Sequence, residues 1–347
     1  MSMQPIKTAI IGYGLSAKTF HIPFIVNLTE FELTAISSSQ RDNIANDWPC
    51  VKYFETAEAL IHTTDAELII ITAPNEAHFS LAKLALDSNK HVILEKPFVT
   101  KVNDGETLIK LAAEKKRILS VYHNRRWDGD YLTVKKLISD GKLGDIKHFE
   151  SHFDRFRPEV RQRWREQSPN GGGILFDLGP HIIDQALQLF GLPNAIAAQC
   201  LIMREGSANV DYFNLVLHYP DKLILLHADL YSAAPNKRFS IKGTKGSYEI
   251  AGLDPQEGRL KAGILPSKTE WAKESPENYG ILYKETSTTS IKTETGGYQH
   301  FFLGIANAIQ HGTEPPVDAE EALWNIKLIE LALESSRLGK TLTIEKH

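Results

Sequence analysis

The chain has 347 residues, of which 42% are hydrophobic and 24% charged, and its formal net charge at pH 7 is −4. This length is too great for one ordinary core and predicts two domains, while the slightly acidic balance argues against nucleic acid or an anionic membrane as partner. No apolar run approaches the roughly 20 residues that span a bilayer, and no basic and then apolar leader precedes the first strand, which favours a cytoplasmic location. With two cysteines, Cys50 and Cys200, we expect no disulfide framework, in keeping with a reducing compartment.

The first 123 residues alternate strand and helix patterns, which predicts an N-terminal Rossmann domain with a parallel, doubly wound sheet. Strands are expected at residues 8–11, 32–37, 68–72, 91–94 and 118–122. Helices fit between them, one over 75–89 and one started by a capping box of Asn103 and Glu106. Pro23 falls inside the helix expected after the first strand, so we predict a break or restart of that helix.

The first strand ends in a glycine turn, Gly12-x-Gly14-x-x-Ala17, in which Leu15 directly follows the second glycine. Gly12 allows a tight turn, Gly14 lets a pyrophosphate approach the backbone, and Ala17 is small enough for helix and strand to pack closely. The phosphates would then meet free N–H groups at the start of a helix. A glycine-rich turn in an α/β protein that binds no nucleotide would match the same pattern, so the motif alone predicts a dinucleotide site without proving one.

Residues 124–347 predict a C-terminal α+β domain with a large, mostly antiparallel open sheet. Gly141 would end a helix over 127–140, and Asp318 and Gly339 would bound a helix over 319–338. A further helix is expected at 301–310, and residues 265–295 are polar and are expected to form long loops. Strand-like stretches lie at 146–156, 195–203, 212–219, 223–231 and 239–242, with hairpin turns at 219–222 and 242–246.

Glu95-Lys96-Pro97 follows the fourth predicted strand of the first domain. The carboxyl ends of strands in such sheets face the ligand crevice, and the proline restricts the backbone of Lys96 to an extended form. A cation held there could polarise a carbonyl or hydroxyl oxygen. An ordinary surface lysine before a turn is the competing interpretation.

A second chemical signal is the glycine run 171–173, followed by Asp177 and His181. We place Pro180 in the first turn of a helix that ends at Gly191, so that Asp177 and His181, four residues apart, meet at the helix entrance. A carboxylate beside a histidine fixes its tautomer and raises its basicity, as a general base requires. Two alternatives remain open. Asp177 could cap the helix, or Asp177, His181 and Asp184 could hold a metal ion. Because no further His or Cys cluster supplies the other ligands, we expect no metal.

The end of the second strand predicts which cofactor is used. NAD sites usually carry an acid there, whereas this chain has Ser37, Ser38 and, shortly after, Arg41. Hydroxyls and a guanidinium suit the 2′-phosphate of NADP, which a carboxylate would repel. We therefore expect NADP. If this segment is an ordinary polar turn and Asp42 binds the ribose of the cofactor, NAD is possible.

Together these motifs resemble the glucose-fructose oxidoreductase/inositol dehydrogenase (Gfo/Idh/MocA) family across nearly the whole chain. The stretches 18–24 and 122–128 resemble the branch that contains NADP-dependent scyllo-inositol dehydrogenase. The resemblance implies a catalytic set of Lys96, Asp177 and His181 in a cleft between the domains. It also implies a lining of the cofactor site by Thr72, Pro74, Asn75, His78, Glu95, Asn124, Trp164 and Arg165.

The sequence thus predicts an NADP(H)-dependent oxidoreductase that exchanges a hydride with a polyol, inositol or sugar. A dinucleotide-sensing protein that kept the fold but lost catalysis is the alternative, and the presence of both Lys96 and His181 disfavours it. We expect a small-molecule substrate and a homodimer or higher homo-oligomer formed through the sheet of the second domain. Five arginines between 155 and 165 are expected to be mostly solvated or to contact an acidic substrate.

Overall fold

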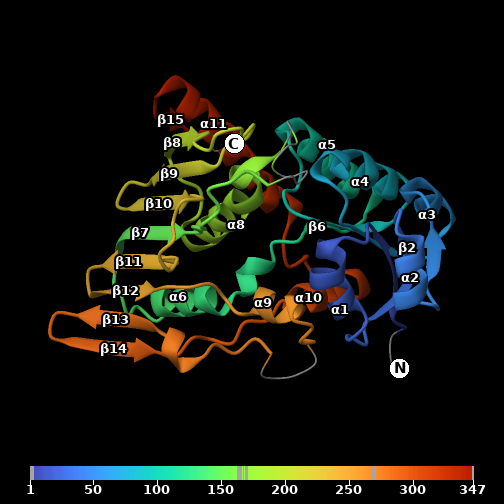
Figure 1. Cartoon of the computed structure of the whole chain (residues 1–347), viewed down its shortest axis with the longest axis horizontal. Helices are drawn as coiled ribbons and strands as arrows, with labels where there is room; N and C mark the ends of the chain where they lie inside the picture. Colours follow the sequence, from blue (N-terminus) through green and yellow to red (C-terminus); the bar gives the residue numbers. More distant parts are fainter. Residues whose placement is uncertain (1–3, 162–165, 167, 169–170, 267–270, 346–347) are drawn as a thin grey trace. The chain divides into compact units, whose positions relative to one another are not determined.

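The computed structural model describes residues 4–161, 166, 168, 171–266 and 271–345. The chain forms two compact units (Figure 1). Unit 1 consists of Met1–Asn124, Gln256–Trp271 and Tyr298–Trp324, and unit 2 consists of Arg125–Pro255, Ala272–Gly297 and Asn325–His347. Two segments from the second half of the sequence therefore belong to the same unit as the N-terminal sheet. The predicted single boundary between residues 123 and 124 assigned them to the second domain.

Unit 1 contains a six-stranded sheet in which all neighbours are parallel, with the order β3-β2-β1-β4-β5-β6. This is the doubly wound order of a Rossmann domain, as predicted. The strands are β1 Ile6–Ile11, β2 Phe31–Ser37, β3 Lys52–Phe54, β4 Leu68–Ile71, β5 His91–Leu94 and β6 Leu119–Val121. The short strand β3 was not predicted, because three half-exposed residues carry too little pattern.

The helices of unit 1 are η1 Ala17–His21, α1 Ile22–Ile25, α2 Arg41–Asp47, α3 Ala57–Thr63, η2 Asn75–Ala77, α4 His78–Asp87, α5 Val102–Lys115, α9 Gln256–Lys261 and α10 Gln299–His311. Most of them lie between these strands in the sequence, and α9 and α10 come from the two later segments. The predicted restart at Pro23 is confirmed, because a π-helical turn ends at His21 and α1 begins with Pro23 in its first turn. The predicted capping box is wrong: the N-cap of α5 is Lys101, and Asn103 lies inside the helix.

Aromatic packing explains why the later segments join unit 1. The rings of Phe24 and Phe302 stack with centroids 5.0 Å apart, and Phe301 packs edge-on against Tyr122 at 4.9 Å. Trp271 adds an edge contact with Phe24 at 5.8 Å. Burial of several large rings contributes several kcal/mol, roughly 1.5–3 for each, so α10 is part of the same hydrophobic core as α1 and the segment that follows β6.

Unit 2 contains a nine-stranded sheet with the order β14-β13-β12-β11-β7-β10-β9-β8-β15. Among the described strands, β7 and β10 pair in parallel and the other neighbours are antiparallel. This confirms the prediction of a mostly antiparallel sheet. The strands are β7 Ile146–His152, β8 Ala195–Leu201, β9 Tyr212–His218, β10 Leu223–Ala228, β11 Phe239–Gly243, β12 Gly246–Ile250, β13 Gly280–Lys284, β14 Ser287–Ile291 and β15 Leu342–Thr343. The hairpin β13–β14 corrects the expectation of loops over 265–295, since β14 is a polar edge strand without an apolar face.

The helices of unit 2 include α6 Gly129–Ser139 and α8 Gly173–Phe190, and short turns form η3 Asn124–Trp127 and η4 Pro276–Asn278. Helix α11, Ala319–Leu338, begins in unit 1 and continues in unit 2. Its predicted ends are confirmed: the Asp318 carboxylate accepts a bond from the Glu320 N–H at 2.6 Å, and Gly339 has a φ of +62°. Helix α8 begins earlier than predicted, so Pro180 lies in its interior rather than in its first turn.

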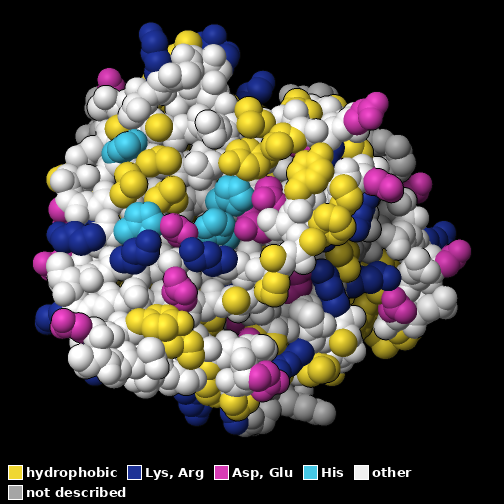
Figure 2. Space-filling model, turned by 60° about the vertical axis from the view of Figure 1, so that its left-hand side comes forward, with side chains coloured by type: hydrophobic (Ala, Val, Ile, Leu, Met, Phe, Trp, Pro, Cys, Tyr) yellow, Lys and Arg dark blue, Asp and Glu magenta, His cyan; other side chains and the backbone are white. Residues whose placement is uncertain are grey.

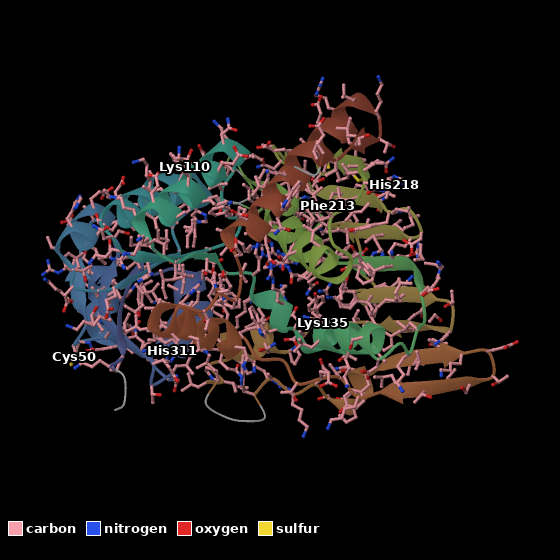
Figure 3. All side chains as sticks on the ribbon, turned by 180° about the vertical axis from the view of Figure 1, so that it is seen from behind. Cys50, Lys110, Lys135, Phe213, His218 and His311 are labelled. Atoms are coloured by element: carbon pink, nitrogen blue, oxygen red, sulfur yellow. The ribbon has the colours of Figure 1, made fainter. Side chains whose placement is uncertain are left out.

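Both cysteines carry free thiols, as expected, and Cys50 lies on the surface (Figure 3). Burial raises the pKa of the Cys200 thiol to about 12. In the part of the chain that the structure describes, no helix combines the length and the apolar character that crossing a membrane requires.

Candidate functional site

The glycine turn of unit 1 lies where the strand order reverses, between β1 and β4. Gly12 has a φ of +97°, a conformation that favours glycine, and its N–H donates to the Ser37 carbonyl at 2.8 Å. A β-carbon at Gly12 would lie 2.6 Å from the Thr72 hydroxyl oxygen. Gly12 is thus fixed between the ends of β2 and β4, at the point where doubly wound sheets bind ligands.

The other turn residues differ in their surroundings. A β-carbon built on Gly14 would meet no atom within 4 Å, so the backbone there is open to a bound group. Leu15 is 62% exposed, whereas Ala17 is fully buried where η1 begins. The turn therefore provides an accessible backbone at Gly14 and a close packing contact at Ala17, as the motif predicts.

A polar network that the sequence analysis did not identify braces this turn. The Tyr13 hydroxyl donates to the Asp47 carboxylate at 2.6 Å and accepts a bond from the Trp48 indole at 3.0 Å. The Gln40 amide donates to the Tyr13 carbonyl at 3.0 Å, and the Lys18 amine lies 4.1 Å from the Tyr13 ring centroid. Burial and Asp47 together raise the pKa of Tyr13, so this phenol stays protonated and ties the glycine turn to α2.

The end of β2 carries hydroxyls and a cation, with no acid before α2. Ser37 is buried, Ser38 accepts a bond from the Gln40 N–H at 3.2 Å, and Arg41 begins α2. Arg41 is exposed, and its guanidinium lies 5.7 Å from the Tyr53 ring centroid. Asp42, the alternative ribose ligand, follows in the first turn of α2.

Glu95 and Lys96 follow β5 directly. Glu95 is buried, and its carboxylate accepts a bond from the Ser16 hydroxyl and contacts the His21 ring at 2.9 Å. Burial alone would raise the pKa of Glu95, but His21, Ser16 and Lys96 outweigh it and lower the pKa to about 2. Glu95 is therefore ionised at neutral pH and fastens the end of β5 to the segment after the glycine turn, while the Lys96 N–H also bonds to its carboxylate at 3.1 Å.

The residues after β4 fix the same edge of the sheet. Thr72 donates its hydroxyl to the Ile11 carbonyl at 2.9 Å, and Pro74 precedes the turn that starts at Asn75. The His78 ring lies 2.9 Å from the Pro97 carbonyl and 3.1 Å from the Ala73 carbonyl. Burial lowers the pKa of His78, and the ring spans the segments that follow β4 and β5, which places it as a support of Lys96-Pro97.

Two groups of predicted cofactor residues remain. Asn124 is buried at the end of unit 1, three residues beyond β6. Trp164 and Arg165 lie outside the described residues. At this edge of unit 1 the structure thus brings together the glycine turn, Ser37, Thr72 and Glu95.

Asp177 and His181 lie on α8 in unit 2, four residues apart and on one face of the helix. The N-cap of α8 is Gly172, so the interpretation of Asp177 as a helix cap is wrong. Asp177 instead accepts a bond from Arg155 at 3.5 Å, while His181 is 6% exposed. Gly173 is needed for packing within the protein, because a β-carbon there would lie 2.5 Å from the Val210 carbonyl oxygen.

Asp184, the second acid of this helix, is held by an arginine. Arg126 forms two parallel bonds to its carboxylate, of 2.9 and 2.7 Å; Asp184 is buried and the Arg126 side chain is 9% exposed. A carboxylate engaged in this way is a structural anchor of α8. The pairing gives Asp184 a role other than the metal ligation considered from the sequence.

The arginine-rich segment is partly anchored rather than wholly solvated. The buried Arg204 pairs with Asp211 and Glu166 at 3.1 Å each, and donates to the carbonyls of Arg157 and Glu159. Arg155 lies 5.1 Å from the Phe153 ring centroid and contacts Asp177, whereas Arg161 is exposed. Arg204 was missed because nothing near it in sequence indicates these partners.

The residues of unit 1 fit a dinucleotide. The positive φ of Gly12, the open space at Gly14 and the hydroxyls after β2 match what a pyrophosphate and an adenosine ribose require. Unit 1 also carries the cation Lys96, and unit 2 separately carries the carboxylate of Asp177 and the imidazole of His181, which are side-chain types that acid–base chemistry at a hydroxyl group uses.

Comparison with known proteins agrees with this arrangement. Residues 6–123 match the family model described as "Oxidoreductase family, NAD-binding Rossmann fold", and residues 135–344 match "Oxidoreductase family, C-terminal alpha/beta domain". The chain is 40% identical to scyllo-inositol 2-dehydrogenase (NADP(+)) of Bacillus subtilis (strain 168), over 99% of this chain and 97% of that protein. It is 41% identical to the uncharacterized oxidoreductase YdgJ of Escherichia coli (strain K12), over 98% and 99%.

Solved structures show the same fold over the whole length. The structure of yvaA from Bacillus subtilis has a TM-score of 0.95 at 38% identity and covers 99% of this chain and 100% of its own. That of YPO2259 from Yersinia pestis has a TM-score of 0.93 at 42% identity, over 99% and 98%. The chain therefore belongs to the Gfo/Idh/MocA oxidoreductase family and is a dehydrogenase of CH–OH donors with a Rossmann domain for a nicotinamide cofactor.

Proposed function

We propose that the protein is an NADP(H)-dependent oxidoreductase that acts on a hydroxyl or carbonyl group of an inositol, another polyol or a sugar. The observation that carries this proposal is the combination of Lys96 after β5 with Asp177 and His181 on one face of α8, in a chain 40% identical to an NADP-dependent inositol dehydrogenase. A non-catalytic sensor would need neither the lysine nor the histidine. We therefore do not retain that alternative.

In the proposed mechanism each residue has one task. His181 takes the proton of the substrate hydroxyl as general base, and Lys96 stabilises the negative charge that develops on the oxygen. Asp177 positions His181 or a neighbouring substrate hydroxyl, with its own carboxylate held by Arg155. A bound nicotinamide would supply the hydride chemistry that amino acid side chains lack.

The substrate class is tested by a panel of inositol stereoisomers, aldoses and sugar acids, each assayed with NADP and with NAD by absorbance of the reduced cofactor. We expect turnover of at least one inositol or sugar with NADP. A panel that gives no turnover in either direction with either cofactor would contradict the proposed substrate class.

We predict that the protein prefers NADP, because Ser37, Ser38 and Arg41 surround the expected place of the 2′-phosphate without an acid before α2. Arg41→Ala should raise KM for NADP by roughly 10- to 100-fold, the value of one or two bonds to a charged group, and leave KM for NAD nearly unchanged. Steady-state kinetics with both cofactors measures this difference.

Lys110→Ala is the matched control, since this exposed cation lies on α5, away from β2 in the sheet order (Figure 3). It should change neither KM. An equal kcat/KM for NAD and NADP in the unmodified protein, or an equal loss for both in Arg41→Ala, would count against a phosphate site at Arg41.

We also infer that the protein assembles at least as a homodimer through the sheet of unit 2. Helix α8 packs on β9 and β10 on one face of this sheet, and the strands alternate between buried and partly exposed residues. Leu223 remains 36% exposed on β10, and Leu201 and Tyr231 are likewise exposed. Figure 2 shows hydrophobic side chains gathered beside histidines on the side that it brings forward. A partly apolar face of this kind favours pairing between copies.

Sedimentation velocity at micromolar concentration should show a dimer or a larger assembly. Leu223→Lys should shift the distribution toward monomer, whereas Val26→Lys, which places the same charge on an exposed apolar residue of unit 1, should not. A monomer at these concentrations, or equal dissociation in both variants, would refute pairing through this face.

A further inference from the structure

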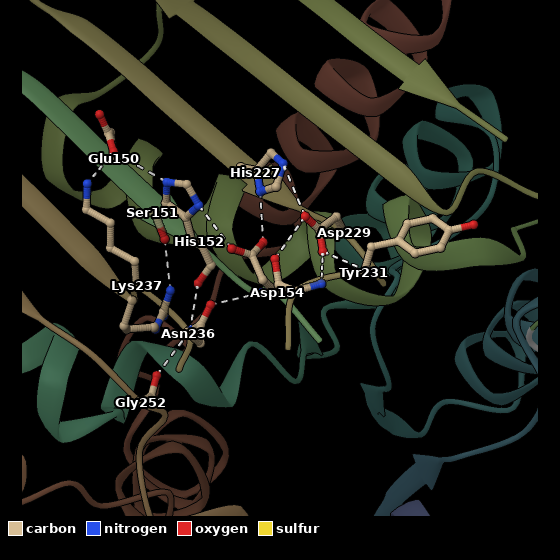
Figure 4. A network of polar contacts seen from close by, with 12 residues as sticks. Glu150, Ser151, His152, Asp154, His227, Asp229, Tyr231, Asn236, Lys237 and Gly252 are labelled. Atoms are coloured by element: carbon tan, nitrogen blue, oxygen red, sulfur yellow. Dashed lines mark hydrogen bonds and ion pairs between the residues drawn. The ribbon is translucent and has the colours of Figure 1, made fainter. Parts of the chain in front are cut away.

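Two histidines and an aspartate of unit 2 converge at one point of the sheet, away from Asp177 and His181 in sequence and on other elements (Figure 4). His152 ends β7 and His227 lies near the end of β10, and the two residues are direct partners in the parallel register of these strands. Asp154 follows β7 two residues after His152, so both side chains emerge on the same side of the extended chain. Sheet pairing therefore fixes the relative positions of all three.

The contacts at this point are close. The Asp154 carboxylate lies 3.2 Å from Nδ1 of His152 and 2.8 Å from Nδ1 of His227, and the two rings have centroids 5.0 Å apart. One potential ligand atom from each residue lies within 4.8 Å of the others. Ligand atoms around a four-coordinate zinc ion lie roughly 3.3–3.5 Å apart, so small rotations of these side chains reach that spacing.

The far side of each imidazole faces a second carboxylate. Nε2 of His152 lies 3.4 Å from Glu150, and Nε2 of His227 lies 4.0 Å from Asp229 (Figure 4). Histidines that ligate a metal through one nitrogen commonly direct the other N–H to a carboxylate, which fixes the tautomer. In both histidines Nδ1 is directed inward to Asp154 and Nε2 outward, on the side of the second carboxylate.

The acidic side chains of the cluster and its fixed backbone also favour the binding of a cation. Asp154, Glu150 and Asp229 give the cluster three acids, and the Lys237 amine lies 3.1 Å from Glu150 on its outer side. The Asn236 side chain accepts a bond from the Asp154 N–H at 2.8 Å and holds the backbone in place.

We propose that His152, Asp154 and His227 form a binding site for one divalent transition-metal ion that takes nitrogen and oxygen ligands, such as Zn²⁺. In a single chain the side chains are 20%, 10% and 16% exposed, so an ion can reach them before the partly apolar face of the sheet pairs with a second copy. Water completes the coordination, since three protein ligands leave a position open. The ion joins the ends of β7 and β10 next to Arg155, the residue that contacts Asp177. This inference is independent of the proposed oxidoreductase activity.

The test is calorimetric titration of Zn²⁺ into the full chain, prepared without an affinity tag and freed of metal by EDTA and dialysis. We expect one ion per chain and a higher melting temperature with Zn²⁺ than with EDTA. His227→Gln and Asp154→Asn should each weaken binding by at least about 100-fold, because loss of a ligand exceeds the 10- to 100-fold loss typical of its supporting groups.

His218→Gln is the matched control, since this histidine lies on the neighbouring strand β9 and is labelled in Figure 3. It should bind Zn²⁺ as the unmodified chain does. X-ray absorption of the Zn²⁺-loaded, unmodified chain gives a readout that does not depend on how the variants fold, and it should show two imidazole ligands and no sulfur. Absence of stoichiometric binding, equal affinity in His227→Gln and His218→Gln, or a sulfur ligand would overturn the proposal.

Discussion

His181→Ala should lower kcat by about 10²–10⁴-fold while leaving the affinity for NADP nearly unchanged. The expected loss is that of a general base, because alanine can neither accept the hydroxyl proton nor bond to the substrate oxygen. His181 lies on α8 in unit 2, whereas the glycine turn and the end of β2 belong to unit 1, so cofactor binding has no direct need of this ring. Turnover with the best substrate of the panel, and fluorescence titration with NADPH, measure the two quantities separately.

A control is needed because His181 is buried, and its removal could disturb α8. His311→Ala removes an exposed imidazole at the end of α10 and should leave kcat unchanged (Figure 3). A melting temperature of His181→Ala close to that of the unmodified protein shows that the loss is chemical. Full turnover in a folded His181→Ala variant would exclude the histidine as the base.

The joint action of Lys96 and His181 is tested by the same assay. If both groups act on one substrate oxygen, the double variant Lys96→Met/His181→Ala should lose little more activity than the worse single variant, since residues that act as a unit are not additive. Losses that multiply would mean that the two side chains act in separate steps, and the assigned mechanism would then need revision.

The regular elements of this protein are readable from sequence where pattern and turn residues agree. Strand β5 and helix α11 have the predicted bounds, and Pro23 marks the predicted restart after η1. Strand β14 was missed because its Ser and Thr residues have no buried face, so no alternation of apolar residues is present. The start of α8 was placed too late because Pro180 is a common first-turn residue, whereas here it is accommodated inside the helix.

The motifs of the proposed site are visible in the sequence for a related reason. The glycine turn, Glu95-Lys96 and the Asp177–His181 spacing depend on neighbours within a few residues, and a sequence displays such spacing directly. The supporting contacts join distant residues: Tyr13 with Trp48, His78 with Pro97, and His152 with His227. Only the strand order brings such partners together, so spacing along the chain could not reveal them.

The buried Arg238 should be the residue of unit 2 whose charge matters most for stability. It is 1% exposed and donates to Asp130 at 3.2 Å, to Ser151 at 2.8 Å and to Gln185 at 2.6 Å. These partners belong to α6, β7 and α8, so one guanidinium connects the sheet with both helices. Arg238→Met keeps much of the apolar stem but leaves the Asp130 carboxylate buried without its cation.

Breaking a buried ion pair from one side costs roughly 3–5 kcal/mol, and we expect Arg238→Met to lower the free energy of unfolding of unit 2 by that amount. Hydrogen exchange of the α8 amides reports on unit 2 separately, which matters because a two-unit chain need not unfold in one step. Arg337→Met, the same change at an exposed pair with Glu334 on α11, should leave exchange unaltered. Adding Asp130→Asn to Arg238→Met should restore part of the loss, since it removes the stranded charge. If Arg238→Met and Arg337→Met exchange alike, the buried network does not stabilise α8 in the way that its geometry indicates.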